Sequence, residues 1–230
     1  MNRTCVVLEN RGLIKVSGED RAEFLQGLIS NDIHHVAPDR AIWAALLTPQ
    51  GKYLHDFFVI ELGGAFYLDC EAGRLMDLGQ RLRKYVLRAK VSLDVVEGFS
   101  VAALFGDGAL QALGLPEGTG AARAWDRGIV YVDPRLAAVG ARAILPSEEV
   151  VGMATVLDFS ISDATAYDRQ RLSAEATTAS AQTSAAQREI MRTPATGAGA
   201  NVFGGGTATF YNYTKTDRHK HLLAASGQSE

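Results

Sequence analysis

The sequence has little of what several protein classes require. It contains only two cysteines, Cys5 and Cys70, and no C-x-x-C pair, which argues against a disulfide framework or a zinc ribbon. The longest apolar run, residues 41–47, is far shorter than the roughly 20 residues of a membrane-spanning helix. No positively charged, apolar signal segment opens the chain. We therefore expect a cytoplasmic protein with no membrane partner.

The common catalytic signatures are absent as well. There is no nucleophile elbow, P-loop, zincin helix or Rossmann glycine fingerprint. The five histidines lack the cysteine or acidic neighbours that a metal site needs. These patterns predict neither a catalytic residue nor a metal ligand. The net charge of −3 gives no global reason to expect nucleic-acid binding, although a local basic patch is compatible with it.

Apolar residues are plentiful, at 47% of 230 residues, which predicts a globular chain with a substantial core in one large domain or two small ones. The pattern up to about residue 150 is one of short strands, often joined as hairpins, with single helices between them, and it indicates an α+β fold. Strands are predicted over 6–8 and 13–16 as one hairpin, and over 41–47 and 53–62 as a second, with Pro49 and Gly51 in its turn.

A helix is predicted near residues 20–28, with Ser17 or Asp20 as its cap, and a second over about 72–87. In the second helix one face carries an apolar stripe that we expect in the core, made of Leu75, Leu78, Leu82 and Val86. Further strands are predicted over 65–68, 91–96, 101–105, 128–132 and 141–145, and a short helix over 109–113.

The composition changes at residue 174. From there to residue 206, 21 of 33 residues are Ala, Thr, Ser or Gly. Such a stretch buries too little apolar surface to offset the entropy of ordering it, so we predict a flexible, low-complexity tail over 174–230. The remaining chain divides into an amino-terminal region, 1–95, and a second α+β region of the same fold, 96–173.

Three blocks of the amino-terminal region resemble a known family in order and spacing: DRAEFLQGLISND at 20–32, LTPQGKYLHDFF at 47–58 and LRKYVLRAKV at 82–91. They are similar to the YgfZ branch of the glycine-cleavage T-protein superfamily, the folate-binding iron–sulfur assembly factors. The resemblance weakens after residue 96 and returns at YDRQRL, 167–172. The family's Lys-Gly-Cys motif and carboxyl-terminal barrel-like domain are absent, so neither Cys5 nor Cys70 inherits a role. We expect a truncated, diverged or frame-shifted end.

The resemblance implies a T-protein-like folate-binding fold, built of hairpins and packed helices in ferredoxin-like halves. It implies tetrahydrofolate or a derivative as cofactor, and iron–sulfur assembly proteins and tRNA as partners. In T-proteins the strand of the second hairpin carries an adjacent acidic pair that contacts the folate. Here the pair reads His55-Asp56, so one acid is missing. A pterin contact remains open at Asp56, whereas aminomethyl transfer is in doubt; an ordinary solvent-facing Asp56 is the alternative.

A pterin slot needs an acidic or amide group for the ring and cations for the glutamate tail. The resemblance and this requirement together give a candidate cofactor site made of Asn31, Asp32, Trp43, Gln50, Lys52, Asp56 and Arg88. Several of these residues have ordinary structural alternatives: Trp43 as a core residue, and Asn31 and Asp32 as turn or capping residues.

The segment 81–90 places five cations within ten residues, of which Arg81, Lys84 and Arg88 share one helical side. This side could bind a polyglutamate tail or RNA phosphates, or simply face solvent. Three functions are therefore left open: a non-enzymatic folate-binding accessory protein for iron–sulfur cluster assembly and tRNA modification, a folate-dependent aminomethyl or one-carbon transferase, and an RNA-binding module.

Overall fold

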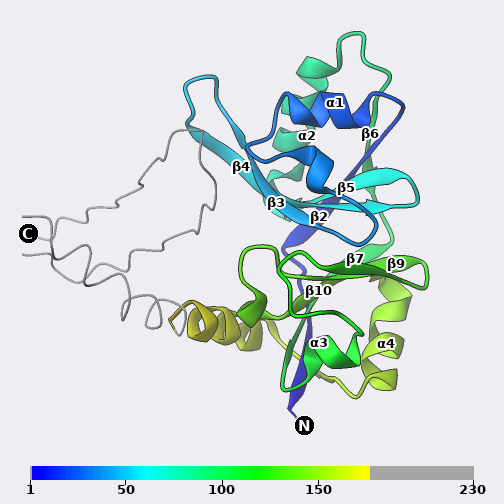
Figure 1. Ribbon diagram of the computed structural model, residues 1–230, viewed down its shortest axis with the longest axis vertical. Helices are drawn as coiled ribbons and strands as arrows, with labels where there is room; N and C mark the ends of the chain where they lie inside the picture. Colours follow the sequence, from blue (N-terminus) through cyan, green and yellow to red (C-terminus); the bar gives the residue numbers. More distant parts are fainter. Residues whose placement is uncertain (1, 177–230) are drawn as a thin grey trace, which may run out of the picture. The chain divides into compact units, whose positions relative to one another are not determined.

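The computed structural model describes residues 2–176 and shows two β-sheets with few helices (Figure 1). The α+β class predicted from the sequence is confirmed. Residues 177–230, which hold most of the predicted tail, lie outside the described part of the chain. A helix over 164–176 runs past the predicted boundary at 174. Among the helices of residues 2–176, none combines the length and the apolar character needed to cross a membrane.

Sheet I contains five strands and holds the second predicted hairpin. Its order is β3 (Ile42–Leu47), β4 (Tyr53–Leu62), β5 (Ala65–Glu71), β2 (Arg11–Ser17) and β6 (Ser92–Val96). The neighbouring pairs are antiparallel. The β3–β4 hairpin is confirmed, and Gly51 adopts φ +80° in its turn, a conformation that glycine reaches without strain.

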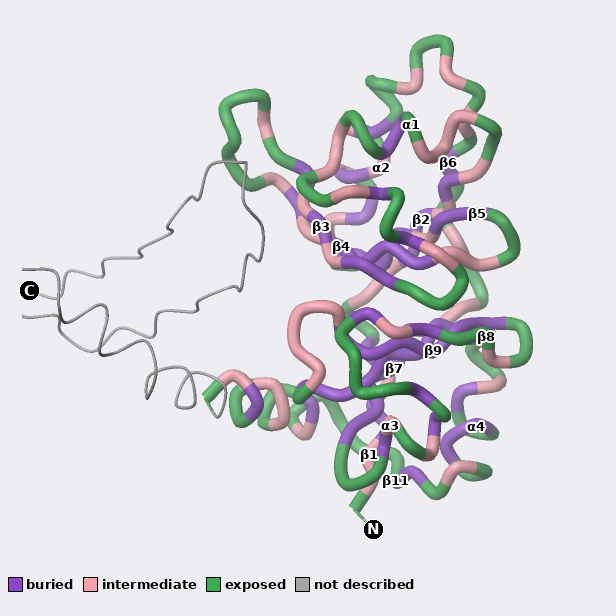
Figure 2. The backbone as a smooth tube through the Cα atoms, in the orientation of Figure 1, coloured by how far each residue is buried: buried purple, intermediate pink, exposed green. Residues whose placement is uncertain are grey.

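Helices α1 (Arg21–Gln26) and α2 (Leu75–Val86), with the short turns η1 (Ile33–His35) and η2 (Ala72–Arg74), accompany sheet I. The predicted stripe of α2 is in the core: Leu75, Leu78 and Leu82 are buried, and Val86 packs against the same cluster. In Figure 2 the buried stretches follow the strands, and the exposed ones follow the loops. Asp20 stands at the start of α1, but its carboxylate accepts from the backbone N–H of Lys90 instead of capping the helix.

Sheet II contains six strands, in the order β11 (Ser160–Ser162), β1 (Arg3–Val7), β7 (Phe99–Gly106), β10 (Ala141–Pro146), β9 (Gly128–Val132) and β8 (Ala122–Trp125). It packs with α3 (Ala109–Ala112), α4 (Val150–Val156) and the turns η3 (Ala137–Val139) and η4 (Ser147–Glu149). The parallel pairing of β1 with β11 joins its first and last strands in the chain.

The predicted first hairpin is wrong. Strand β1 pairs with β7 and β11 in sheet II, whereas β2 pairs with β5 and β6 in sheet I. The chain crosses between the sheets at Leu8, whose backbone N–H donates to the carbonyl of Val101 at 2.8 Å. The turn residues were recognised correctly, but a turn does not oblige the strands on its two sides to pair with each other.

Candidate functional site

The β3–β4 hairpin brings three of the predicted site residues together. Asp56 accepts a hydrogen bond from Trp43 Nε1 on its Oδ2 at 3.0 Å. Asn31 Nδ2 donates to the backbone carbonyl of Trp43 at 2.9 Å. Register explains the first contact: Asp56 lies opposite Ala45 and Trp43 opposite Phe58, so both side chains stand on one face of sheet I.

A tyrosine that no sequence pattern marked as a candidate completes this cluster. The Tyr53 hydroxyl donates to Asp56 Oδ1 at 2.6 Å. Burial, together with the hydrogen bond and negative charge of Asp56, raises the pKa of Tyr53 to about 12, so the hydroxyl keeps its proton at neutral pH. Each carboxylate oxygen of Asp56 thus receives one donor and retains a lone pair for a ligand N–H. We call Asn31, Trp43, Tyr53 and Asp56 the carboxylate cluster.

The neighbouring His55 faces the other side of the sheet, toward α2. His55 is 2% exposed, and its Nε2 lies 2.8 Å from Asp77 Oδ2. Arg81 Nε donates to the same oxygen at 2.9 Å. Because successive strand residues alternate faces, position 55 does not place a second acidic group beside Asp56.

The remaining predicted site residues lie elsewhere. Asp32 caps η1 through the backbone N–H of His34, at 3.0 Å. Gln50 and Lys52 are exposed at the β3–β4 turn, and Arg88 is exposed just beyond the end of α2. Among the described residues, the hydrogen-bond partners of Asp56 are Trp43 and Tyr53, and not Gln50, Lys52 or Arg88. Of the predicted residues, the structure therefore brings Asn31, Trp43 and Asp56 into contact, with Asp32 next to Asn31 in the chain.

On the same face as the carboxylate cluster, Phe58 leads to a buried set of charges between the sheets. The Phe58 side chain is 1% exposed, and the guanidinium carbon of Arg142 lies 4.1 Å from its ring centroid. Arg142 Nη1 donates to Asp69 at 2.9 Å, and Tyr131 OH donates to the same carboxylate at 3.1 Å. Arg142 belongs to sheet II and Asp69 to sheet I, so these contacts fasten one sheet to the other.

Two further arginines join this buried set. Arg11 Nε donates to Asp69 at 2.6 Å, and Arg135 Nη2 donates to Asp133 at 2.7 Å. Burial acts to raise the pKa of Asp133, but the hydrogen bonds and charges of Arg135 and Arg142 outweigh it, so that pKa lies below its usual range. The Arg135 side chain is 21% exposed and its guanidinium carbon is 4.8 Å from the Phe58 ring centroid, which makes it a partly accessible cation close to that ring.

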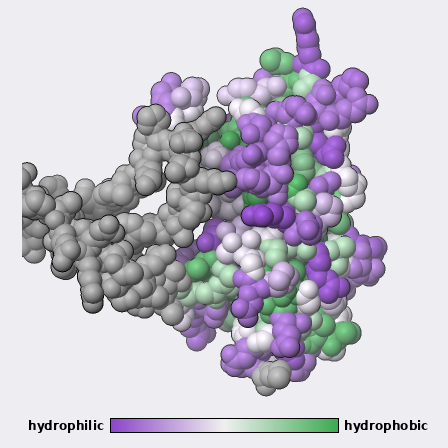
Figure 3. All heavy atoms as spheres, in the orientation of Figure 1, coloured by the Kyte–Doolittle hydropathy of each residue, from purple (hydrophilic) through white to green (hydrophobic). Residues whose placement is uncertain are grey.

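Sequence reasoning missed Tyr53, Phe58 and Arg135. Tyr53 reaches Asp56 because a β-bulge shifts the register of the hairpin between Leu46 and Leu47. No residue pattern predicted this bulge. The Asp133–Arg135 spacing was visible in the sequence, but its connection to Phe58 depends on how the two sheets pack. The face of the molecule in Figure 3 is mostly hydrophilic, with its apolar residues in small separate patches.

No protein-family model matches the chain. Among curated proteins, the chain is 27% identical over 159 residues to the mitochondrial iron–sulfur cluster assembly factor IBA57 homolog of Mycosarcoma maydis, covering 63% of this chain and 37% of that one. It is 31% identical over 110 residues to the tRNA-modifying protein YgfZ of Hamiltonella defensa, covering 48% and 33%. It is 32% identical over 105 residues to mouse mitochondrial IBA57, covering 40% and 29%.

The fold matches a solved structure of glycine cleavage system aminomethyltransferase T from Bartonella henselae, with a TM-score of 0.59, 19% identity, and coverage of 70% of this chain and 47% of that one. The two sheets and their helices thus have a T-protein-like fold. The chain is thus similar in sequence to IBA57 and YgfZ proteins and in fold to a glycine-cleavage T-protein, which supports the resemblance to the YgfZ/glycine-cleavage T-protein superfamily. The chain spans about a third of the length of those relatives.

The expected cytoplasmic location is wrong by this comparison. The IBA57 proteins of Mycosarcoma maydis, Neurospora crassa and mouse are all named as mitochondrial. The absence of a recognisable secretory signal, on which the expectation rested, does not discriminate a cytoplasmic protein from a mitochondrial one, because transit peptides have a different composition.

Proposed function

We propose that the chain is a folate-binding accessory protein that supports iron–sulfur cluster assembly and tRNA modification. The similarity to proteins named for these two roles supports the second half of the proposal. The observation that carries the first half is the Asp56 carboxylate, oriented by Trp43 Nε1 and Tyr53 OH on the face of sheet I that leads to Phe58.

The chemistry of a tetrahydrofolate fits this arrangement. Its pterin ring is flat and presents N–H donors along one edge, which a carboxylate held by two other donors can accept. Trp43, which is partly exposed, provides an aromatic surface beside that carboxylate. Arg135 is the cation that we assign to the tail carboxylates, because it is partly accessible next to Phe58.

Within this proposal, residues 1–95 hold the folate-binding region and residues 96–173 form the second α+β region, which contributes Arg135. The transferase alternative gains no support from the carboxylate cluster, because His55 turns toward Asp77 and α2. Iron–sulfur assembly proteins and tRNA remain the proposed partners.

The test is a calorimetric titration of the full chain with tetrahydrofolate under anaerobic conditions. Asp56→Asn removes the charged acceptor, and hydrogen bonds to charged groups contribute about 1.5–3 kcal/mol, so the dissociation constant should rise about ten-fold or more. Asp107→Asn is the matched control, because Asp107 is exposed in the loop between β7 and α3. Absence of a binding signal from the unmodified chain, or an equal affinity of Asp56→Asn, refutes folate binding at this site.

The assembly role is tested separately in cells that lack their IBA57-type protein. The unmodified chain should restore the activity of an iron–sulfur enzyme, and Asp56→Asn should restore less of it. Restoration by both chains to the same level would separate the assembly role from folate binding.

A further inference from the structure

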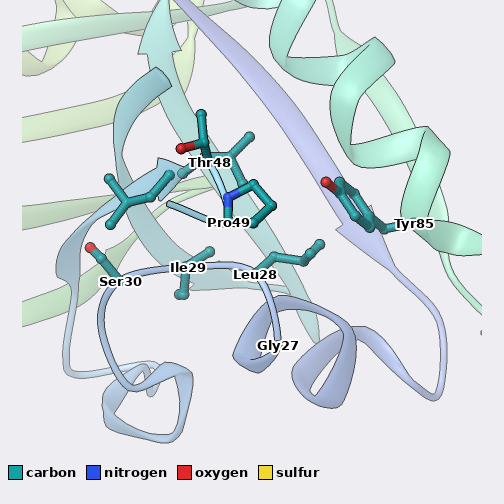
Figure 4. Close-up of a pocket in the computed structure, with 9 residues that line it drawn as sticks. Gly27, Leu28, Ile29, Ser30, Thr48, Pro49 and Tyr85 are labelled. Atoms are coloured by element: carbon teal, nitrogen blue, oxygen red, sulfur yellow. The ribbon is translucent and has the colours of Figure 1, made fainter. Parts of the chain in front are cut away.

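A groove lies beside the β3–β4 hairpin, between α2 and the segment that follows α1. Its cavity of about 270 Å³ is lined by three elements: the segment after α1, the β3–β4 hairpin and α2. In Figure 4, Tyr85 extends from α2 toward Leu28 and Pro49. A neighbouring hollow of about 120 Å³ shares Leu46, Leu47 and Tyr85 with it and adds Leu54, Arg81 and Lys84. We call the two together the α2 groove.

Large apolar side chains are left accessible at this groove. Tyr85 is 50% exposed and Leu47 is 38% exposed. Just beyond α2, Leu87 is 88% exposed and is held at φ +39°, a conformation that is costly for a leucine. The core does not require these residues, because the other face of α2 already supplies its buried stripe. An apolar, concave surface of this kind is typical of an interaction site.

The rim of the groove carries uncompensated positive charge. Lys84 lines it, and Arg88 lies four residues further along the chain, beyond the end of α2; both are exposed. Among the described residues neither forms an ion pair, whereas Arg81 is already bonded to Asp77. The segment 81–90 contains five cations and no acidic residue. The groove is therefore lined by apolar side chains together with polar groups, and Lys84 stands at one edge of it.

We propose that the α2 groove docks an acidic amphipathic segment of a partner protein. Its apolar side chains fill the floor between Tyr85 and Leu47, and its Asp or Glu side chains meet Lys84 and Arg88. The concave form argues for a protein segment over a lipid bilayer, whose flat surface does not reach the floor. The accessible apolar side chains at the groove, among them Leu28, Leu47 and Pro49, favour a peptide with apolar side chains over a nucleic acid, whose affinity comes mainly from its phosphates. The proposal is independent of folate binding, since the carboxylate cluster occupies the opposite face of β4.

The probe is a fluorescent peptide of about 15 residues with leucines at i, i+4 spacing and glutamates elsewhere, measured by anisotropy on the full chain. A double charge reversal, Lys84→Glu with Arg88→Glu, should weaken binding about ten-fold or more. Tyr85→Ser should weaken it to a similar extent, because exposed aromatic anchors dominate such interfaces. All three positions are exposed, so circular dichroism should show an unchanged fold.

Two matched variants and four other ligands make the test decisive. Arg169→Glu reverses an exposed charge elsewhere, and Val151→Ser removes an apolar side chain that is 60% exposed on α4; both should leave affinity unchanged. Equal binding of a scrambled peptide of the same composition, or of a lysine-for-glutamate version, overturns the proposal. So does tighter binding of a single-stranded RNA oligonucleotide or of anionic phospholipid vesicles that is lost in Lys84→Glu with Arg88→Glu.

Discussion

At the scale of single residues, the carboxylate of Asp56 is the group on which the proposed function depends. Trp43 and Tyr53 fix its direction from two sides, and neither contact is between neighbours in sequence. The sequence indicated Asp56 and Trp43 as separate candidates, and the hairpin register would have placed them on one face. It gave no indication of Tyr53, because that contact depends on the bulge next to Leu47.

Tyr53→Phe removes one of the two donors without changing the ring. We expect tetrahydrofolate binding to weaken about ten-fold, since the lost hydrogen bond is to a charged group. The free energy of unfolding should change by less than about 1 kcal/mol, because Tyr53 is 52% exposed. Calorimetric titration and urea unfolding measure the two quantities. Tyr85→Phe is the matched control, as Tyr85 lies in the α2 groove; an unchanged affinity in Tyr53→Phe would show that Trp43 alone orients Asp56.

At the scale of elements, sequence patterns predicted a strand pair correctly where the two strands follow each other directly in the chain. The β3–β4 hairpin followed from apolar strands around Pro49 and Gly51, and the helix α2 followed from its leucine spacing. The same reasoning failed for β1 and β2, because the signals of a hairpin and of a crossover between sheets are alike over Leu8 to Arg11. Which sheet a strand joins is decided by partners that lie about 50 to 160 residues away in the sequence.

His55 links two of these elements, since it bonds from β4 to Asp77 on α2. Burial lowers the pKa of His55 below its ordinary value of 6.5, and the hydrogen bond with Asp77 offsets only part of this effect. The folded chain thus binds a proton at His55 less readily than the unfolded chain does. The contribution of His55 to the free energy of unfolding should be fully present above about pH 7. It should be lost as the pH drops through and below the ordinary histidine pKa.

Urea unfolding at about pH 7.5 and pH 5.5 measures this loss. His55→Gln should reduce the difference in unfolding free energy between the two pH values, whereas His34→Gln, at an exposed residue, should preserve it. Asp77, the other partner in this contact, is protonated only at lower pH. The hydrogen bond from Arg81 lowers the pKa of Asp77 below 3.8, so its contribution is lost only under more acidic conditions. An identical pH dependence in His55→Gln would contradict the assignment to His55.

At the scale of the whole described fold, the buried charges between the sheets could not be predicted from the sequence. Asp69 and Arg142 are 73 positions apart, and neither is marked by any pattern in its own strand. Their contact exists only because sheet I and sheet II pack face to face around Phe58 and Tyr131. Composition predicted a large core, but it did not predict that this core would contain ionised groups.

Arg142→Met tests whether these charges hold the two sheets together. The change leaves Asp69 and Asp133 with one arginine fewer in a buried setting, and removal of one member of a buried ion pair costs about 3–5 kcal/mol. Since Asp69 keeps Arg11 and Asp133 keeps Arg135, we expect the lower end of that range. Lys90→Met, which breaks the exposed ion pair with Glu19, should have little effect and serves as the control.

The two tryptophans of the chain allow each sheet to be followed separately, because Trp43 lies in β3 of sheet I and Trp125 in β8 of sheet II. In single-tryptophan backgrounds, the Arg142→Met loss of unfolding free energy should be the same whether urea unfolding is followed by Trp43 or by Trp125 fluorescence. Equal losses follow if Arg142 stabilises both sheets as one cooperative unit through Asp69. If only the Trp125 signal shifts, then Arg142 stabilises sheet II alone, and the cohesion of the sheets must come from the apolar contacts around Phe58 and Tyr131.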